Sequence, residues 1–207
     1  MKRIVVGIAL LALALPLSAF ATNSVDFTNS GGTLSGSSAG LSLSGSVLTV
    51  VNGYGGMGLI TGNNLGSVSF TTGALMSGSL QTGGVFASGG TFTITGNGTG
   101  GLPSGAIFSG TFTSPVTWTM TDNANGTHNY ILVGSISGTW ANGQAAGGAT
   151  SQLTIAINTG KGMFNGNVRL ASGDTSIVSS VPEPGTLGLL GTGMVGLAGV
   201  VRRKLKS

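Results

Sequence analysis

Cysteine is absent from the 207 residues of this chain, and histidine occurs once, as His128. The first absence excludes a disulfide framework, a thiolate metal site and a cysteine nucleophile. The second excludes a site built on a pair of histidine ligands. Charged residues make up only 6% of the sequence, so acids and bases for catalysis are scarce as well.

The few charged residues gather at the two ends of the sequence. Lys2 and Arg3 lie at the start, and a basic cluster lies at the end: Arg202, Arg203, Lys204 and Lys206. Residues 22–180 hold only two basic and three acidic residues, namely Lys161, Arg169, Asp26, Asp122 and Asp174. The formal net charge of +4 and the pI of about 10.0 therefore come from the two end segments and not from the body. Nucleic-acid binding, which needs a basic face on the folded part, is not expected.

The body, residues 22–180, is rich in Gly, Ser, Thr, Asn and Ala. Helices with an exposed face need strong helix formers and charged residues, and the body has few of either. Short runs with a two-residue alternation, bounded by Gly and Asn, are typical of strands. We therefore predict an all-β fold, a single antiparallel β-sandwich or barrel-like domain.

Two strand pairs are predicted. In the first, residues 116–120 and 129–140 form a hairpin around the Asn-Gly turn chemistry of residues 122–126. In the second, residues 153–157 pair with residues 164–170 across the loop 158–162. Further strands are predicted at 41–51, 67–71, 91–95 and 106–113. Residues 22–66 contain many glycines, which leave few side chains to pack on either face. We still expect them to be ordered, because Leu41, Leu43 and Val47 share one face.

A Ser-Gly-Ser/Thr triplet recurs without a fixed period, starting at Ser35, Ser44, Ser77, Ser109 and Ser137. The last two triplets share a longer frame, residues 108–112 and 136–140. A glycine within a strand marks a bulge, a bend or a close backbone approach, so the triplets could be points where strands curve. A chance product of the Gly/Ser/Thr-rich composition is the alternative.

No arrangement of residues in the sequence indicates a catalytic site. His128 sits beside a turn, where a solvated loop residue is the common explanation, and no nucleophile elbow accompanies it. The acids of the body include Asp122, which opens a turn only loosely similar to a calcium loop because Ala124 stands where an oxygen ligand belongs. We expect no catalytic residue, no metal, no cofactor and no enzymatic activity.

Aromatic side chains offer one binding hypothesis. Trp118, Tyr130 and Trp140 could stack on sugar rings if their faces were exposed. Large rings in a chain with few aromatics are more often needed for the core, and that alternative is favoured here.

Both ends of the sequence carry the residue patterns of sorting signals. Residues 1–21 combine Lys2 and Arg3 with an apolar run and end in a small-x-small pattern, so Ala19 and Ala21 predict cleavage by signal peptidase. At the other end, residues 181–184 form an extended Val-Pro-Glu-Pro segment. Residues 185–201 could make a short transmembrane helix about 25 Å long, and the basic residues of 202–207 would hold its end in the cytoplasm.

Residues 181–207 resemble the PEP-CTERM sorting signal of Gram-negative bacteria. The resemblance covers the Pro182-Glu183-Pro184 tripeptide, the Leu/Gly-rich helix and the cluster Arg202, Arg203 and Lys204, in that order. It implies recognition of the tripeptide by exosortase, a membrane-embedded cysteine transpeptidase-like enzyme, and a stop signal at the basic cluster. It also implies a transient stay at the inner membrane, removal of the helix and delivery to the cell surface or an exopolysaccharide matrix.

The body itself matches no family that its residues identify. Its near absence of ionisable groups favours a structural or interaction protein of the cell surface or extracellular matrix. The alternatives are a carbohydrate-binding module of a biofilm matrix, a plain single-pass anchored β domain and, least favoured, a hydrolase.

Overall fold

A computed structural model describes residues 23–179, with side chains at 24–146 and 157–178. The predicted signal helix and transmembrane helix lie outside the described residues. Among those residues, no helix has the length and apolar character needed to cross a membrane. The elements are β1 (Asn23–Ser30), β2 (Thr33–Ser37), β3 (Gly40–Asn52), η1 (Tyr54–Gly56), β4 (Leu59–Thr71), β5 (Leu75–Ser79), β6 (Gly83–Phe86), β7 (Gly89–Asn97), β8 (Ser104–Phe112), β9 (Val116–Asp122), β10 (His128–Trp140), β11 (Ala145–Asn158), β12 (Asn167–Arg169) and β13 (Ser172–Ser179).

These strands form one antiparallel sheet in the order β11-β13-β1-β3-β4-β7-β8-β10-β9-β6-β5. β12 pairs with β2, which pairs with β3. β10 also pairs with β11, so the path of pairings from β11 to β10 returns to its start. The sheet stays open at β5, whose partner in the described part of the chain is β6 alone. The prediction of an all-β, antiparallel fold is confirmed.

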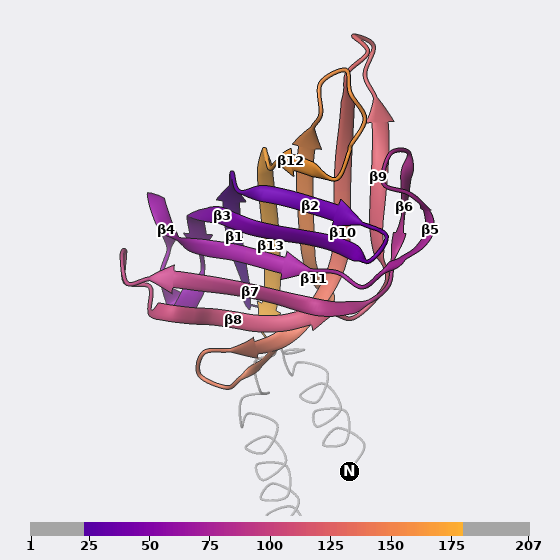
Figure 1. Cartoon of the computed structure of the whole chain (residues 1–207). Helices are drawn as coiled ribbons and strands as arrows, with labels where there is room; N and C mark the ends of the chain where they lie inside the picture. The colour runs from indigo at the N-terminus through magenta and orange to yellow at the C-terminus, as the bar shows by residue number, and fades with distance from the viewer. Residues whose placement is uncertain (1–22, 180–207) are drawn as a thin grey trace, which may run out of the picture.

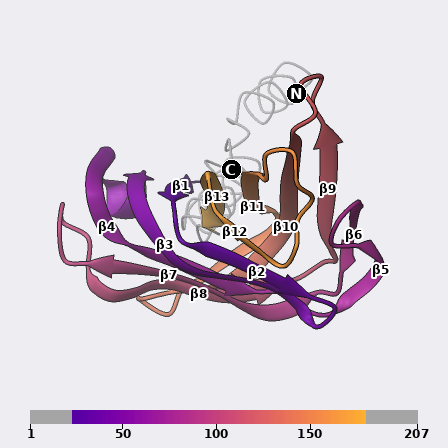
Figure 2. The ribbon, with the colours of Figure 1, turned by 45° about the horizontal axis from the view of Figure 1, so that its top comes forward.

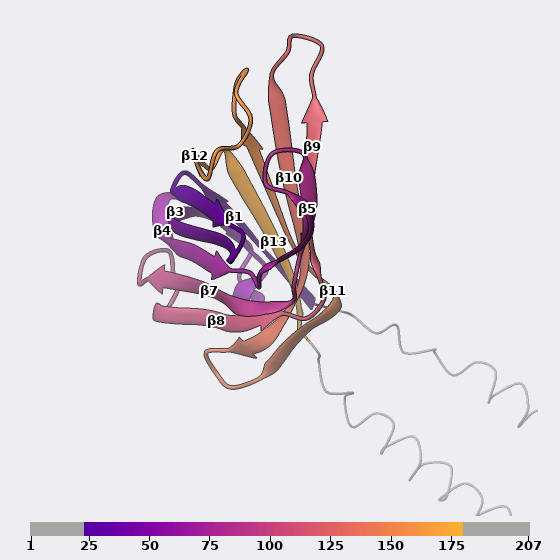
Figure 3. The ribbon, with the colours of Figure 1, turned by 45° about the vertical axis from the view of Figure 1, so that its right-hand side comes forward.

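The sheet bends into two layers that face each other (Figure 1). β3, β4, β7 and β8 form one layer, and β9, β10, β11 and β13 run across them in the other. Figure 3 shows the two layers from the side, meeting at one end and splayed at the other. β1 connects the layers on one side by pairing with both β3 and β13, and the β8–β10 pair connects them on the other.

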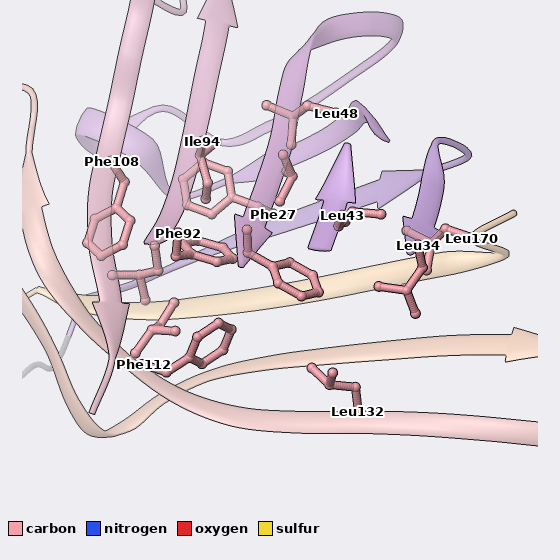
Figure 4. Close-up of a cluster of buried hydrophobic side chains, with 14 of the residues drawn as sticks. Phe27, Leu34, Leu43, Leu48, Phe92, Ile94, Phe108, Phe112, Leu132 and Leu170 are labelled. Atoms are coloured by element: carbon pink, nitrogen blue, oxygen red, sulfur yellow. The ribbon is translucent and has the colours of Figure 1, made fainter. Parts of the chain in front are cut away.

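Apolar side chains fill the space between the layers. Figure 4 shows Phe92 and Phe112 of one layer gathered there with Leu132 of the other. All three are at most 2% exposed. The strands place them there because alternate residues point to opposite faces, so one face of each strand supplies the core.

The first predicted hairpin is confirmed, and the second pairing is wrong. β9 pairs with β10 in a register that sets Trp118 opposite Leu132, both buried as their alternation predicts. β11 includes residues 153–157, but its partners are β10 and β13 rather than residues 164–170. Of that last segment only β12 is a strand, and it pairs with β2. The cause is long-range pairing, which overrides the apparent hairpin between neighbouring runs.

Residues 23–66 are ordered into β1, β2, β3 and the start of β4, as expected. The predicted face of β3 is only half right. Leu41 and Leu43 are buried, but the pairing register then shifts before Ser46, and Leu48 is buried in place of Val47. Gly45 lies at this shift with φ +67°, a conformation that glycine adopts without strain. The bulge therefore exchanges the faces at residues 46–48, and a second register shift between Leu48 and Val50 returns Val51 to the buried side.

Candidate functional site

The sorting residues predicted from the sequence lie outside the described residues. These are Ala19 and Ala21, the tripeptide Pro182, Glu183 and Pro184, and the cluster Arg202, Arg203 and Lys204. The structure does fix where both end segments begin. Asn23 pairs with Ser179 across β1 and β13, so the first and last described residues are neighbours. The tripeptide follows Ser179 after only two residues.

The three aromatic residues considered for sugar contact belong to the core. Trp118 is 1% exposed, Tyr130 0% and Trp140 7%. The rings of Trp118 and Tyr130 stack with centroids 5.0 Å apart, and Trp140 packs edge-on against Phe108 at 5.4 Å. Since no ring presents a free face to solvent, the sugar-platform hypothesis for these residues is corrected in favour of the core.

The polar atoms of this aromatic cluster also face inward. The Trp118 indole donates to the Leu80 carbonyl at 2.9 Å, and the Tyr130 hydroxyl donates to the Gln81 carbonyl at 2.7 Å. The same hydroxyl accepts a hydrogen bond from the Phe164 amide at 3.0 Å. Two strand residues therefore hold the turn between β5 and β6 and the loop before β12 against the core.

His128 is not the solvated loop residue that was expected. It is the first residue of β10, opposite Asp122 of β9, and its Nδ1 lies 2.6 Å from Oδ1 of that carboxylate. The His128 side chain is 16% exposed and the Asp122 side chain 67%. Among the described residues, no three His, Cys, Asp or Glu side chains lie close enough to hold a metal ion. The pair joins the ends of two strands, and no nucleophile is hydrogen-bonded to the histidine ring within residues 23–179.

A surface that the sequence analysis did not identify lies on the outer side of the layer formed by β4, β7 and β8, and it continues onto β10. On β4 and β7 Ser or Thr occupies alternate positions with a buried apolar residue between, and on β8 and β10 the residue between is a half-buried glycine, Gly110 or Gly138. We name this surface the hydroxyl face; it consists of Ser67, Ser69, Thr71, Thr91, Thr93, Thr95, Ser109, Thr111, Ser137 and Thr139. Its sequence signal is the repeated pattern Ser/Thr-x-Ser/Thr.

Strand register aligns these hydroxyls into rows. Ser69 pairs with Thr93, Thr93 with Ser109, and Ser109 with Thr139, so one row crosses four adjacent strands. Neighbouring rows contain the pairs Thr71–Thr91 and Thr111–Ser137. Strands are about 4.8 Å apart and alternate residues about 6.7 Å apart along a strand, so the hydroxyls form a two-dimensional lattice.

Some hydroxyls of this face hydrogen-bond to each other, and others do not. The hydroxyls of Ser67 and Thr95 are 2.7 Å apart, and those of Thr71 and Thr91 3.1 Å apart. In the described part of the chain, the hydroxyls of Thr93, Ser109 and Thr139 make no hydrogen bond to protein. These groups, each donor and acceptor, are available to a ligand or to water.

Comparison with known proteins identifies the tail and leaves the body unassigned. A family model described as PEP-CTERM protein-sorting motif matches residues 180–204. No match was found among curated proteins or among solved structures.

Proposed function

From the PEP-CTERM sorting motif that this chain carries at residues 180–204, we propose that the protein is a non-enzymatic structural or interaction component of the bacterial cell surface or extracellular matrix. The motif implies export, processing by an exosortase and a membrane-associated sorting step before the surface. The proposal concerns the final site and the role of the β domain there.

The character of the domain supports a structural or interaction role. In the described residues the charged side chains are Asp26, Asp122, Lys161, Arg169 and Asp174, and of these only Asp122 lies within 4 Å of a basic side chain, the His128 ring at 2.6 Å. Enzymes need acids, bases or nucleophiles brought together in a site that excludes water. A sheet that buries nearly all its aromatic residues and presents Ser and Thr outward is instead suited to contact with hydrated, uncharged partners.

The proposed order of events uses the two ends of the chain. Signal peptidase removes residues 1–21 after Ala21, and the apolar segment 185–201 then holds the protein in the inner membrane. The cluster Arg202, Arg203 and Lys204 stops transfer because positive charge resists crossing the bilayer. Exosortase recognises Pro182, Glu183 and Pro184 and releases the domain outward.

Cell fractionation of the producing bacterium tests this proposal. The wild-type protein is expected at the surface or in the matrix, without its basic cluster. A variant with Pro182, Glu183 and Pro184 replaced by alanine is expected in the inner-membrane fraction with the tail intact. Equal delivery of both proteins to the matrix would favour a plain secreted protein, and retention of both in the membrane would favour a plain single-pass anchor.

A further inference from the structure

We propose that the hydroxyl face binds neutral polysaccharide chains. This inference deepens the proposed function and depends on it for bringing the domain into a matrix. Sugar hydroxyls, like those of Ser and Thr, both donate and accept hydrogen bonds, so two hydroxyl lattices can satisfy each other over many contacts. Each contact is weak, and affinity comes from their number.

Charge on the surface determines which polysaccharides fit. None of the ten residues of the hydroxyl face is ionisable, and the five charged residues of the described chain lie on β1, β9, β12, β13 and a loop. An anionic polymer would need basic partners to offset its desolvation, and this face offers none. An uncharged polymer meets no such cost.

The side chains of the face also disfavour a protein partner. Cores of protein interfaces are rich in aromatic residues, methionine and arginine. The large exposed apolar side chains of the described chain, Leu59, Met76, Ile131 and Met163, are not part of the hydroxyl face. Burial of apolar surface therefore contributes little to association there.

Curvature argues for a flexible polymer rather than a crystalline surface such as ice. Figure 2 shows β3, β4, β7 and β8 bowed around the interior, which makes their outward side convex. A flat crystal plane touches a convex lattice along one row at most, whereas a polysaccharide chain can follow the curve. The continuous row from Ser69 to Thr139 crosses four strands and gives such a chain a path.

The test compares two triple variants of the protein purified from its producing bacterium. The first, Thr93→Val, Thr111→Val and Thr139→Val, removes hydroxyls from β7, β8 and β10 and keeps β-branched side chains. The control, Thr117→Val, Thr119→Val and Thr121→Val, removes three exposed hydroxyls from β9, where Thr119 lies between Gly83 and Ile131 rather than in a lattice. Circular dichroism and thermal unfolding check that both variants fold.

Binding is measured to the neutral polysaccharide fraction of the bacterium's own matrix and to cellulose, with alginate as the anionic comparison. The wild type is expected to bind the neutral polymers better than alginate, the first variant at least about tenfold more weakly, and the control within about twofold of wild type. A third variant, Thr93→Ser, Thr111→Ser and Thr139→Ser, keeps the hydroxyls and is expected to bind like wild type.

Four results would overturn the inference: no binding of wild type to the neutral polymers, equal loss in both Val variants, preference for alginate, or ice-growth inhibition or self-association in place of polysaccharide binding. If the protein reaches the matrix and still fails these binding tests, the lattice inference is wrong and the proposed function survives. If the protein never reaches the matrix, the proposed function fails instead.

Discussion

Gly110 of β8 lies directly opposite Gly138 of β10, at the centre of the pairing that connects the two layers. The two glycines belong to the two longer Ser-Gly-Thr frames, residues 108–112 and 136–140, which pair with each other over their whole length. A Cβ atom on Gly138 would overlap the Ser109 carbonyl oxygen and the Gly110 Cα. At these two positions the backbones of the strands therefore approach too closely for a side chain.

Replacing Gly138 by alanine is expected to lower the free energy of unfolding by at least about 2 kcal/mol, because the added methyl group meets backbone that cannot rotate away. Chemical denaturation of the variant and the wild type measures the difference. Gly58→Ala is the matched control, since nothing lies within 4 Å of its Cβ and its φ is not positive. Equal stability of Gly138→Ala and the control would contradict the close approach.

Tyr130→Phe is expected to destabilise the domain by about 2 kcal/mol, because the Gln81 carbonyl and the Phe164 amide lose their shared partner inside the protein. Thermal unfolding measures the loss. Tyr54→Phe serves as control, since the Tyr54 hydroxyl has no protein partner within residues 23–179. Polysaccharide binding should be unchanged in Tyr130→Phe. A selective loss of binding without loss of stability would restore the sugar-contact hypothesis for this ring.

His128→Gln and Asp122→Asn are each expected to change stability by less than about 1 kcal/mol, since the carboxylate is largely exposed and such pairs contribute little. Surface delivery and matrix association should also persist. Adding Asp174→Asn to the panel covers a further acid of the body. If any of these changes abolished a hydrolytic activity of the purified protein, the non-enzymatic proposal would be wrong.

Insertion of about ten Gly and Ser residues after Ser180 is expected to speed removal of the tail. Ser179 is still paired with Asn23 in the sheet, and the tripeptide at 182–184 begins only three residues later. At about 3.5 Å per residue this leaves roughly 10 Å between the folded sheet and the processing enzyme. Pulse-chase labelling measures the rate, with the same insertion into the exposed 123–126 turn as control. Slower or unchanged processing would show that the short connection does not limit access.

Sequence periodicity was sufficient for the strands whose two faces differ sharply. Trp118 lies between Thr117 and Thr119, and the turn after its strand carries Asn-Gly, so both the hairpin and the buried face of β9 could be predicted. The same reasoning failed at β3, because the bulge at Gly45 exchanges the faces and no residue pattern marks which glycine forms a bulge.

Pairings between strands that are far apart in the sequence could not be predicted from residue patterns. β1 pairs with β13 and β2 with β12, and each of these contacts joins segments more than a hundred residues apart. Their partners are selected by the whole fold rather than by local propensity. The hydroxyl face was likewise not predicted. Ser and Thr recur at alternate positions of several strands in the sequence, but the rows depend on register and appear only when the strands are aligned.

Intact mass measurement of the protein recovered from outside its producing bacterium tests the central claim most directly. An exported, sorted β domain should begin near residue 22 and lack both the apolar segment 185–201 and the basic cluster at 202–204. A mass that includes Met1, or a tail intact through Ser207, would contradict that account.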